Sequence, residues 1–464
     1  CTISGITRRM NAPRIYVPGC NSRDWLAVTG LVLAALLFFV WPIPRTISLR
    51  DLLLVTCLGL FAWLVYRDRH VPFSWQSLRI PLAFYLVLSI WIVFVALVVS
   101  SETVWALGEI KGQWLKATIA LVVGGLFGKI ALRNDGLRRM ALIVVGVTLL
   151  LHVLYVNYEA LRHPSIGTFV RIAGLTDGPD KSNYLTNMLL YLLLADICLR
   201  LVSHQRFLPI GSIQLVCIVA LALLAVLFEN MRNGITELAI VLSLAWAVMA
   251  AVSNHVRRVA ILSVGFMFII IVLVLGYLNL RQDDRWRTFL ETVPIALNTD
   301  IKGWISDSQP QPKLANGQTV DSSNYMRLAR MKGGMELTFD YQWGVGFGRN
   351  AFGHAVMKKY GVAASHSHSG FVDMAIGTGL PGLLLWLGFL GSLFAFGWRS
   401  FRRTHDYYAL ALLFVVTGYS VRMVLDSIVR DHMLQMFLFL AAFLAVLSTA
   451  RLGRPQVEIS APPA

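Results

Sequence analysis

The sequence is dominated by apolar runs that are long enough to cross a bilayer. A helix needs roughly 20 apolar residues to span a hydrocarbon core of about 30 Å. Twelve such runs cover residues 24–43, 51–66, 79–100, 114–132, 139–158, 184–202, 209–228, 234–252, 258–280, 380–398, 407–425 and 433–450. Backbone groups inside a bilayer must be hydrogen-bonded internally, so these runs favour helices. We therefore predict an all-α polytopic membrane protein with about twelve transmembrane helices.

The composition excludes several other classes of protein. Of the 464 residues, 56% are hydrophobic and only 14% are charged, which is far more apolar than an ordinary soluble enzyme. The net charge of +16 comes largely from basic residues near the ends of the spans, which indicates membrane orientation rather than nucleic-acid binding. The bilayer is thus an expected partner and nucleic acid is not. The five cysteines show no CxxC pairing, so we expect neither a disulfide framework nor a cysteine metal site.

The basic residues of the short loops predict the orientation of the chain. Nineteen arginines fall on the side that carries the N-terminus, against ten lysines and arginines on the other side. This bias places both termini in the cytoplasm, and nothing at the N-terminus is typical of a cleaved signal peptide. The predicted divisions are a cytoplasmic segment 1–23, spans one to nine over 24–280, a long extracytoplasmic loop 281–369, a re-entrant segment with three spans over 370–450, and a cytoplasmic tail 451–464.

The loop 281–369 is predicted to contain short helices. Helix-like spacing of apolar residues occurs over 281–293 and again over 325–339, whereas 301–323 is typical of an irregular loop. Glycines and a proline at 377–382 predict an unwound or re-entrant stretch over 370–379 that leads into span ten. Spans seven and eight are separated only by 229–233, which predicts a tight antiparallel hairpin.

Arginines on the extracytoplasmic side are candidate binding residues, because the orientation bias disfavours them there. Arg232 lies in a turn too short to leave the headgroup region. It is either an interfacial residue that pairs with Glu229 or lipid phosphates, or a fixed clamp for a phosphorylated lipid. Arg327 and Arg330 share roughly one helix face, which could equally be a solvated surface. The same side also holds Arg171, Lys181, Arg422 and Arg430, of which Asp426 and Asp431 could neutralise the last two.

Two histidines at the end of the long loop are candidates for acid–base chemistry. His366 and His368 immediately precede a segment that enters the membrane. Histidine takes up a proton near neutral pH and is the commonest general base. The pair could instead bind a metal, but it lacks accompanying cysteines or a carboxylate cluster. Each histidine taken alone could also be purely structural.

Four stretches together resemble the O-antigen ligase and polymerase superfamily. HSGFVDMAIGTGLPG places Gly-Leu-Pro-Gly eleven residues after His368, a spacing that His366 does not have. LLAVLFENMRNGITELAIVL resembles the short outer turn of that family with its arginine, here Arg232. SSNYMRLARMKGGMELTFDYQWGVGFGRNAF resembles the segment that carries a second arginine, here Arg327. RIAGLTDGPDKSNYLTNMLLYLLL resembles the glycine-rich outer loop and contains Arg171.

The resemblance implies a GT-C-like bundle that works at the periplasmic face of a Gram-negative inner membrane. Members take a glycan from undecaprenyl diphosphate, and the ligases transfer it to a sugar hydroxyl of lipid A-core. The implied catalytic residue is His368, and the implied diphosphate ligands are Arg232, Arg327 and Arg171. We add His366, Arg330 and Arg422 as accessory candidates.

The chemistry of the predicted site is consistent with metal-independent transfer. Guanidinium groups can stabilise a departing diphosphate, so no metal and no cofactor is expected. A single displacement with His368 as base would invert the anomeric carbon. The alternatives are an O-antigen polymerase, a protein O-oligosaccharyltransferase of the same superfamily, and a twelve-span lipid or solute transporter. The transporter would require two related halves with paired charges, and the sequence shows no such symmetry.

Overall fold

The computed structural model of the protein is helical throughout its regular elements. It describes residues 22–69, 74–163, 171–203, 206–252, 259, 263, 284–300, 302–306 and 309–452. The helices in this part of the chain are α1 (Ser22–Val40), α2 (Ile47–Arg67), η1 (Trp75–Leu78), α3 (Arg79–Phe94), η2 (Val95–Val99), α4 (Thr103–Glu109), η3 (Ile110–Trp114), α5 (Leu115–Ala131), α6 (Asp135–Arg162), α7 (Pro179–Ser203), α8 (Ser212–Glu229), α9 (Arg232–Val252), α11 (Asp284–Ala296), η4 (Lys302–Trp304), α12 (Ser322–Asp340), α13 (Ala351–Tyr360), α14 (Gly370–Thr404), α15 (Tyr407–Leu425) and α16 (Asp431–Leu452).

The structure confirms a polytopic membrane protein. Ten of the described helices or helix runs are long and apolar enough to span a bilayer, and they coincide with ten of the twelve predicted spans. The first predicted span corresponds to α1, whose apolar part, Trp25–Val40, is shorter than the other ten. The predicted span 258–280 lies outside the described residues, apart from the helical positions 259 and 263.

The central helix of the bundle is α16. In its most apolar stretch of 18 residues, 89% are buried inside the protein. Its neighbour α5 approaches it closely because α5 carries Gly124 and Gly128, one helical turn apart, on the facing side. A Cβ at Gly124 would lie 2.1 Å from the Phe439 carbonyl oxygen of α16. In contrast, only 28% of the residues in the most apolar 18-residue stretches of α2, α3 and α8 are buried. The remaining apolar surface of these helices is available to lipid.

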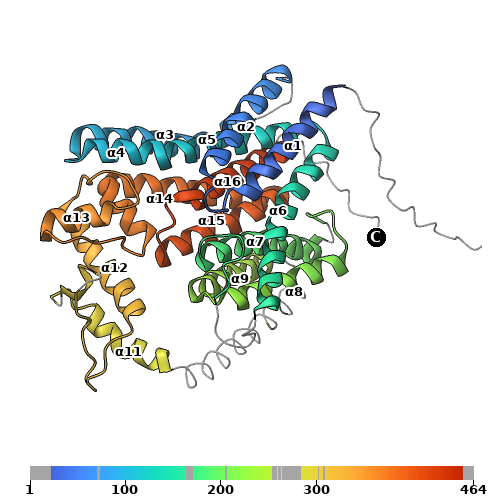
Figure 1. Ribbon diagram of the computed structural model, residues 1–464. Coiled ribbons are helices and arrows are strands. Elements are labelled where there is room, and N and C mark those ends of the chain that lie inside the picture. Colours follow the sequence, from blue (N-terminus) through green and yellow to red (C-terminus); the bar gives the residue numbers. More distant parts are fainter. Residues whose placement is uncertain are drawn as a thin grey trace, which may run out of the picture.

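The long loop forms a small helical layer with its own apolar core. The predicted helices at 281–293 and 325–339 are confirmed as α11 and α12, while α13 was not foreseen from the sequence. Trp304, Tyr325 and Phe352 are buried in this core, together with Val372 and Ile376 from the first turns of α14. Figure 1 shows α4, α11, α12 and α13 beyond the same end of the bundle. The loop layer is therefore attached to the membrane part chiefly through α14.

The prediction of an unwound stretch over 370–379 is wrong. Residues 370–378 are helical, and α14 is broken only at Gly379, where φ is 72° and ψ is 178°. A break in a helix leaves backbone groups without their helical hydrogen-bond partners. Here the glycine-rich segment 342–346 supplies new partners for these groups. The backbone N–H of Gly346 donates to the carbonyl of Gly377, and that of Leu380 donates to the carbonyl of Gln342. Because these groups are paired, the chain remains helical on the N-terminal side of the break.

The predicted tight turn between spans seven and eight is present between α8 and α9. The two helices do not, however, pack chiefly against each other as a hairpin would. Only Asn230 and Met231 separate α8 from α9, and Asn230 adopts the left-handed conformation that ends a helix. The two helices nevertheless pack mainly on other partners: α8 lies against α6 and α7, and α9 lies against α7 and α15. The polar residues of α7 separate them, because these residues hydrogen-bond to Glu229 of α8 and to Glu237 and Gly234 of α9.

Candidate active site at the head of helix α14

His368 lies in a short loop that is fixed to α14 and to the segment after α15. The Ser367 N–H donates to the Asp373 carboxylate at 3.2 Å, and the Ser427 hydroxyl donates to the same carboxylate. The Ser369 hydroxyl donates to the Met423 carbonyl at 3.2 Å, and the Gly370 N–H donates to the Asp426 carbonyl at 2.9 Å. Asp373 thus joins the loop that carries His368 to the 426–430 segment.

The backbone of His368 is itself unusual. Its φ is 61°, in the left-handed region that a β-carbon disfavours. Such a residue costs of the order of 1–3 kcal/mol and persists only where its surroundings hold it in place. Here the Ser367, Ser369 and Asp373 hydrogen bonds on either side of His368 hold it.

Three arginines act electrostatically on the half-buried His368. Burial is the main cause that lowers the pKa of His368 to about 3, followed by His366, Arg327, Arg330 and Arg430. The rings of His366 and His368 meet at an angle of 61° with their centroids 4.3 Å apart. His368 is therefore neutral at neutral pH and lies in a strongly positive field.

Arg327 connects the loop layer with the start of α9. Its Nη1 donates to the Asn233 side-chain oxygen at 2.9 Å, and the Asn233 amide donates to the Leu425 carbonyl at 3.0 Å. Arg232, the residue before Asn233, is partly buried at the first position of α9. The structure therefore brings the turn with Arg232 and the helix with Arg327 into contact. The helix dipole at the N-terminus of α9 also favours an anion at this point.

Arg330 has a different position from Arg327, although both lie on α12. It is 1% exposed, and its guanidinium donates to the Trp304 carbonyl at 3.1 Å, to the Ser365 hydroxyl at 3.0 Å and to the His366 carbonyl at 3.4 Å. Its guanidinium also lies 5.9 Å from the centroid of the Phe352 ring. Through these contacts, Arg330 fixes the position of residues 365–366, which precede His368, and we call it the bracing arginine.

Arg422 forms an ion pair with Glu237 inside the bundle. It is fully buried, and its Nη1 lies 2.8 Å from the Glu237 carboxylate and 2.9 Å from the Asn183 side-chain oxygen. Glu237 also accepts a hydrogen bond from the Tyr191 hydroxyl. Arg422 therefore holds α7, α9 and α15 together within the bundle, and this is a structural rather than a ligand-binding arrangement.

Arg171 is exposed beside the end of α8, where the N–H of Ile172 donates to the Phe228 carbonyl at 3.1 Å. It is not among the residues that act most strongly on His368.

Sequence reasoning missed Arg430, Asp373 and Asn233 as members of this site. Arg430 was set aside because Asp431 follows it, yet it acts on His368 and lines a small cavity with Asp373, Ser427 and Phe347. Its Nε donates to the Ser427 carbonyl at 2.8 Å. The orientation bias that singled out Arg232 applies equally to Arg430, and it was the available signal.

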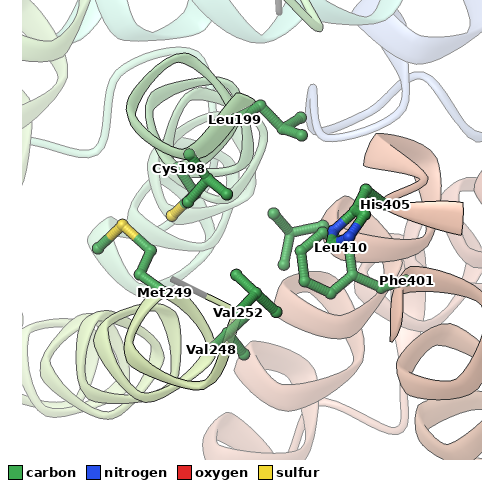
Figure 2. A pocket seen from close by; sticks show the side chains of 9 residues that line it. Cys198, Leu199, Val248, Met249, Val252, Phe401, His405 and Leu410 are labelled. Carbon is green, nitrogen blue, oxygen red and sulfur yellow. The ribbon is translucent and has the colours of Figure 1, made fainter. Parts of the chain in front are cut away.

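Another cavity lies at the opposite end of α14 and has a different character. Figure 2 shows Cys198, Met249, Phe401 and His405 around it, on α7, α9 and the end of α14. Its lining is almost entirely apolar. The concentration of cationic groups around His368 therefore distinguishes the head of α14 as the candidate active site.

A comparison with protein families finds one match in this part of the chain. Residues 217–387 match the family model described as O-antigen ligase. The matched region runs from α8 to α14 and contains Arg232, Arg327 and His368, whereas Arg171 and Arg430 lie outside it. No curated protein matches the chain. Over α8 to α14, this chain is therefore similar to the O-antigen ligase family.

Proposed function

We propose that this chain is an O-antigen ligase that transfers a polysaccharide from undecaprenyl diphosphate to a sugar hydroxyl of lipid A-core. The observation that carries the proposal is the neutral His368 held beside Arg327, Arg330 and Arg430 at the head of α14. The reaction takes place on the periplasmic face of a Gram-negative inner membrane. The family itself implies a glycosyltransferase-type enzyme of the ligase and polymerase class.

The arginines supply the charge stabilisation that the leaving group needs. The acceptor oxygen forms a bond to the anomeric carbon, and the bond from that carbon to the diphosphate breaks with its electron pair. Undecaprenyl diphosphate leaves, and the anomeric configuration inverts. Arg232, Arg327 and Arg430 bind the diphosphate in this proposal, and guanidinium groups perform this task without a metal. Arg171 is not part of the proposed clamp.

His368 accepts the proton of the acceptor hydroxyl. Burial, and after it the positive neighbours, lower the pKa of free His368 to about 3, so the imidazole is unprotonated but weakly basic before the donor arrives. A bound diphosphate brings negative charge among the same arginines and thereby raises the pKa of His368. We infer that the base gains strength when the donor is in place, which confines proton transfer to the donor complex.

The test uses purified protein in detergent with undecaprenyl diphosphate-linked glycan, lipid A-core and EDTA. Transfer is followed by gel shift for the wild type and for His368→Asn, since asparagine tolerates the left-handed backbone. The matched control is His405→Asn, because His405 has a φ of 48° at the opposite end of α14. We expect transfer by the wild type and the control, and a loss of about 10²-fold or more for His368→Asn.

Two results would contradict the proposal. Near-normal transfer by folded His368→Asn would remove His368 as the base. Extension of a second lipid-linked glycan, with lipid A-core left unmodified, would identify a polymerase instead of a ligase.

A further inference from the structure

A basic pocket lies at the end of the bundle opposite to His368. It has a volume of about 190 Å³ and is formed where η1 and the first turn of α3 meet the last turns of α14. Ser77, Ile80, Ala395, Arg399 and Arg403 line it. None of the described residues in its lining is acidic. We call this cavity the arginine pocket.

An apolar cavity of about 180 Å³ adjoins the arginine pocket. The two share Pro81, and the apolar cavity is lined by side chains of α3, α5, α14 and α16, including Leu82, Leu393 and Val446. Lys129, in the last turn of α5, also lines it. The pair of cavities therefore offers an apolar space with cationic groups at its end, which is the distribution of polarity that an amphipathic anion requires.

The position of the two cavities matches one membrane surface. From Gly379 to Arg403, α14 runs for about 36 Å at 1.5 Å per residue, close to the thickness of a bilayer core. Because His368 precedes the other end of α14, an α14 that spans the bilayer would place the arginine pocket at the headgroup level of the opposite leaflet. Ile80 and Leu387 are exposed apolar residues of α3 and α14, so this face of the bundle is open to lipid.

We propose that the arginine pocket binds the phosphate headgroup of an anionic phospholipid, whose acyl chain occupies the adjoining apolar cavity. The guanidinium groups of Arg399 and Arg403 contact the phosphate oxygens, for which their planar geometry is suited. The lipid bridges α3, α5 and α14 and stabilises their packing. The proposal is independent of the transfer reaction at His368.

The test measures the thermal unfolding midpoint of delipidated protein in an uncharged detergent. Phosphatidylglycerol is titrated against phosphatidylcholine with the same acyl chains, and inorganic phosphate is titrated separately. We expect phosphatidylglycerol to raise the midpoint saturably, with a larger effect than phosphatidylcholine. Inorganic phosphate alone is expected to have little effect, because it lacks an acyl chain to fill the apolar cavity.

Three variants separate a built site from general charge attraction. Arg399→Ala/Arg403→Ala should weaken the apparent affinity for phosphatidylglycerol at least tenfold. Gly125→Leu should also weaken it without loss of charge, since Gly125 lines the apolar cavity and a Cβ there meets nothing closer than 3.9 Å. Arg402→Ala is the matched control. Its guanidinium lies 5.7 Å from the Trp398 ring centroid, and Arg402 does not line the arginine pocket.

Several outcomes would overturn the proposal. Equal stabilisation by inorganic phosphate would show a site for free anions rather than lipid. Equal weakening by Arg402→Ala would show non-specific attraction to a basic surface. Wild-type affinity in Gly125→Leu would remove the acyl-chain site, and wild-type affinity in the double arginine variant would remove the headgroup site.

Discussion

The arginines at and near His368 have the same side chain but different surroundings, and these surroundings decide what each arginine can do. Arg327, Arg330 and Arg422 carry identical side chains, but only Arg327 combines partial exposure with a place beside the start of α9. Arg330 is saturated by backbone and hydroxyl acceptors, and Arg422 is paired with Glu237. Exposure and pairing, rather than residue type, thus decide which guanidinium can bind an anion.

Substitution of Arg327 should damage transfer more than it damages the fold. We expect Arg327→Ala to lower kcat/KM for the donor on the order of 10²-fold, because one preorganised donor to the leaving group is lost. Arg327→Lys should retain part of the activity, since it keeps the charge but not the planar fork. Initial rates at varied donor concentration measure the effect, with Lys332→Ala on the same helix as control. An Arg327→Ala variant as active as that control would refute the clamp.

Arg430→Ala should change the pH dependence of the reaction in a defined direction. Arg430 contributes to the lowered pKa of His368, so its removal raises that pKa. His368 then becomes protonated, and inactive as a base, at a higher pH than in the wild type. The acid limb of kcat/KM, measured from about pH 2 to pH 8, should therefore move to higher pH. An unmoved limb, or one that moves to lower pH, would contradict the assigned neighbourhood.

The helices α5 and α14 show which properties of an element can be predicted locally. Mean hydropathy and length were sufficient to find both spans, whereas the close approach of α5 to α16 at Gly124 and Gly128 is visible only in the packed structure. The continuity of α14 before Gly379 was not predictable in the same way. It depends on hydrogen bonds from the 342–346 segment, which lies more than thirty positions earlier in the chain.

The contact between α5 and α16 should be sensitive to a single methyl group. Gly124→Ala places a Cβ against the Phe439 carbonyl, which α16 can relieve only by moving its backbone. We expect a loss of about 1–3 kcal/mol in the free energy of unfolding, seen as a lower thermal midpoint. Gly146→Ala in α6 is the control, because a Cβ there meets nothing within 4 Å. Equal midpoints for the two variants would show that the helices do not approach so closely.

Across the whole molecule, one buried ion pair ties the helices that carry the site. Arg422 and Glu237 join α15 to α9, and Asn183 adds α7. These helices set the positions of Asn233 and of the Met423 carbonyl that accepts from Ser369. The site therefore depends on the assembly of segments that are far apart in sequence.

Removing one partner of the Arg422–Glu237 ion pair should lower the stability of the protein more than replacing both partners by apolar residues. Glu237→Gln leaves the Arg422 charge buried with a neutral neighbour, and we expect a loss of about 3–5 kcal/mol in stability. The double variant Glu237→Leu/Arg422→Met buries no charge and should be more stable than the single variant. Thermal unfolding in detergent, with size-exclusion profiles as a check on folding, compares the two. A single variant as stable as the wild type would contradict the burial of this ion pair.

Hydropathy and the spacing of apolar residues were enough to predict ten of the observed spans and the two loop helices. These features are local, because a span is recognised by about twenty consecutive residues. Only the tertiary structure separated the bracing Arg330 and the ion-paired Arg422 from Arg327, and only it brought Arg430 and Asp373 to His368. The physical reason is that the exposure and pairing of a polar group depend on which distant helices pack around it, and no local pattern encodes that packing.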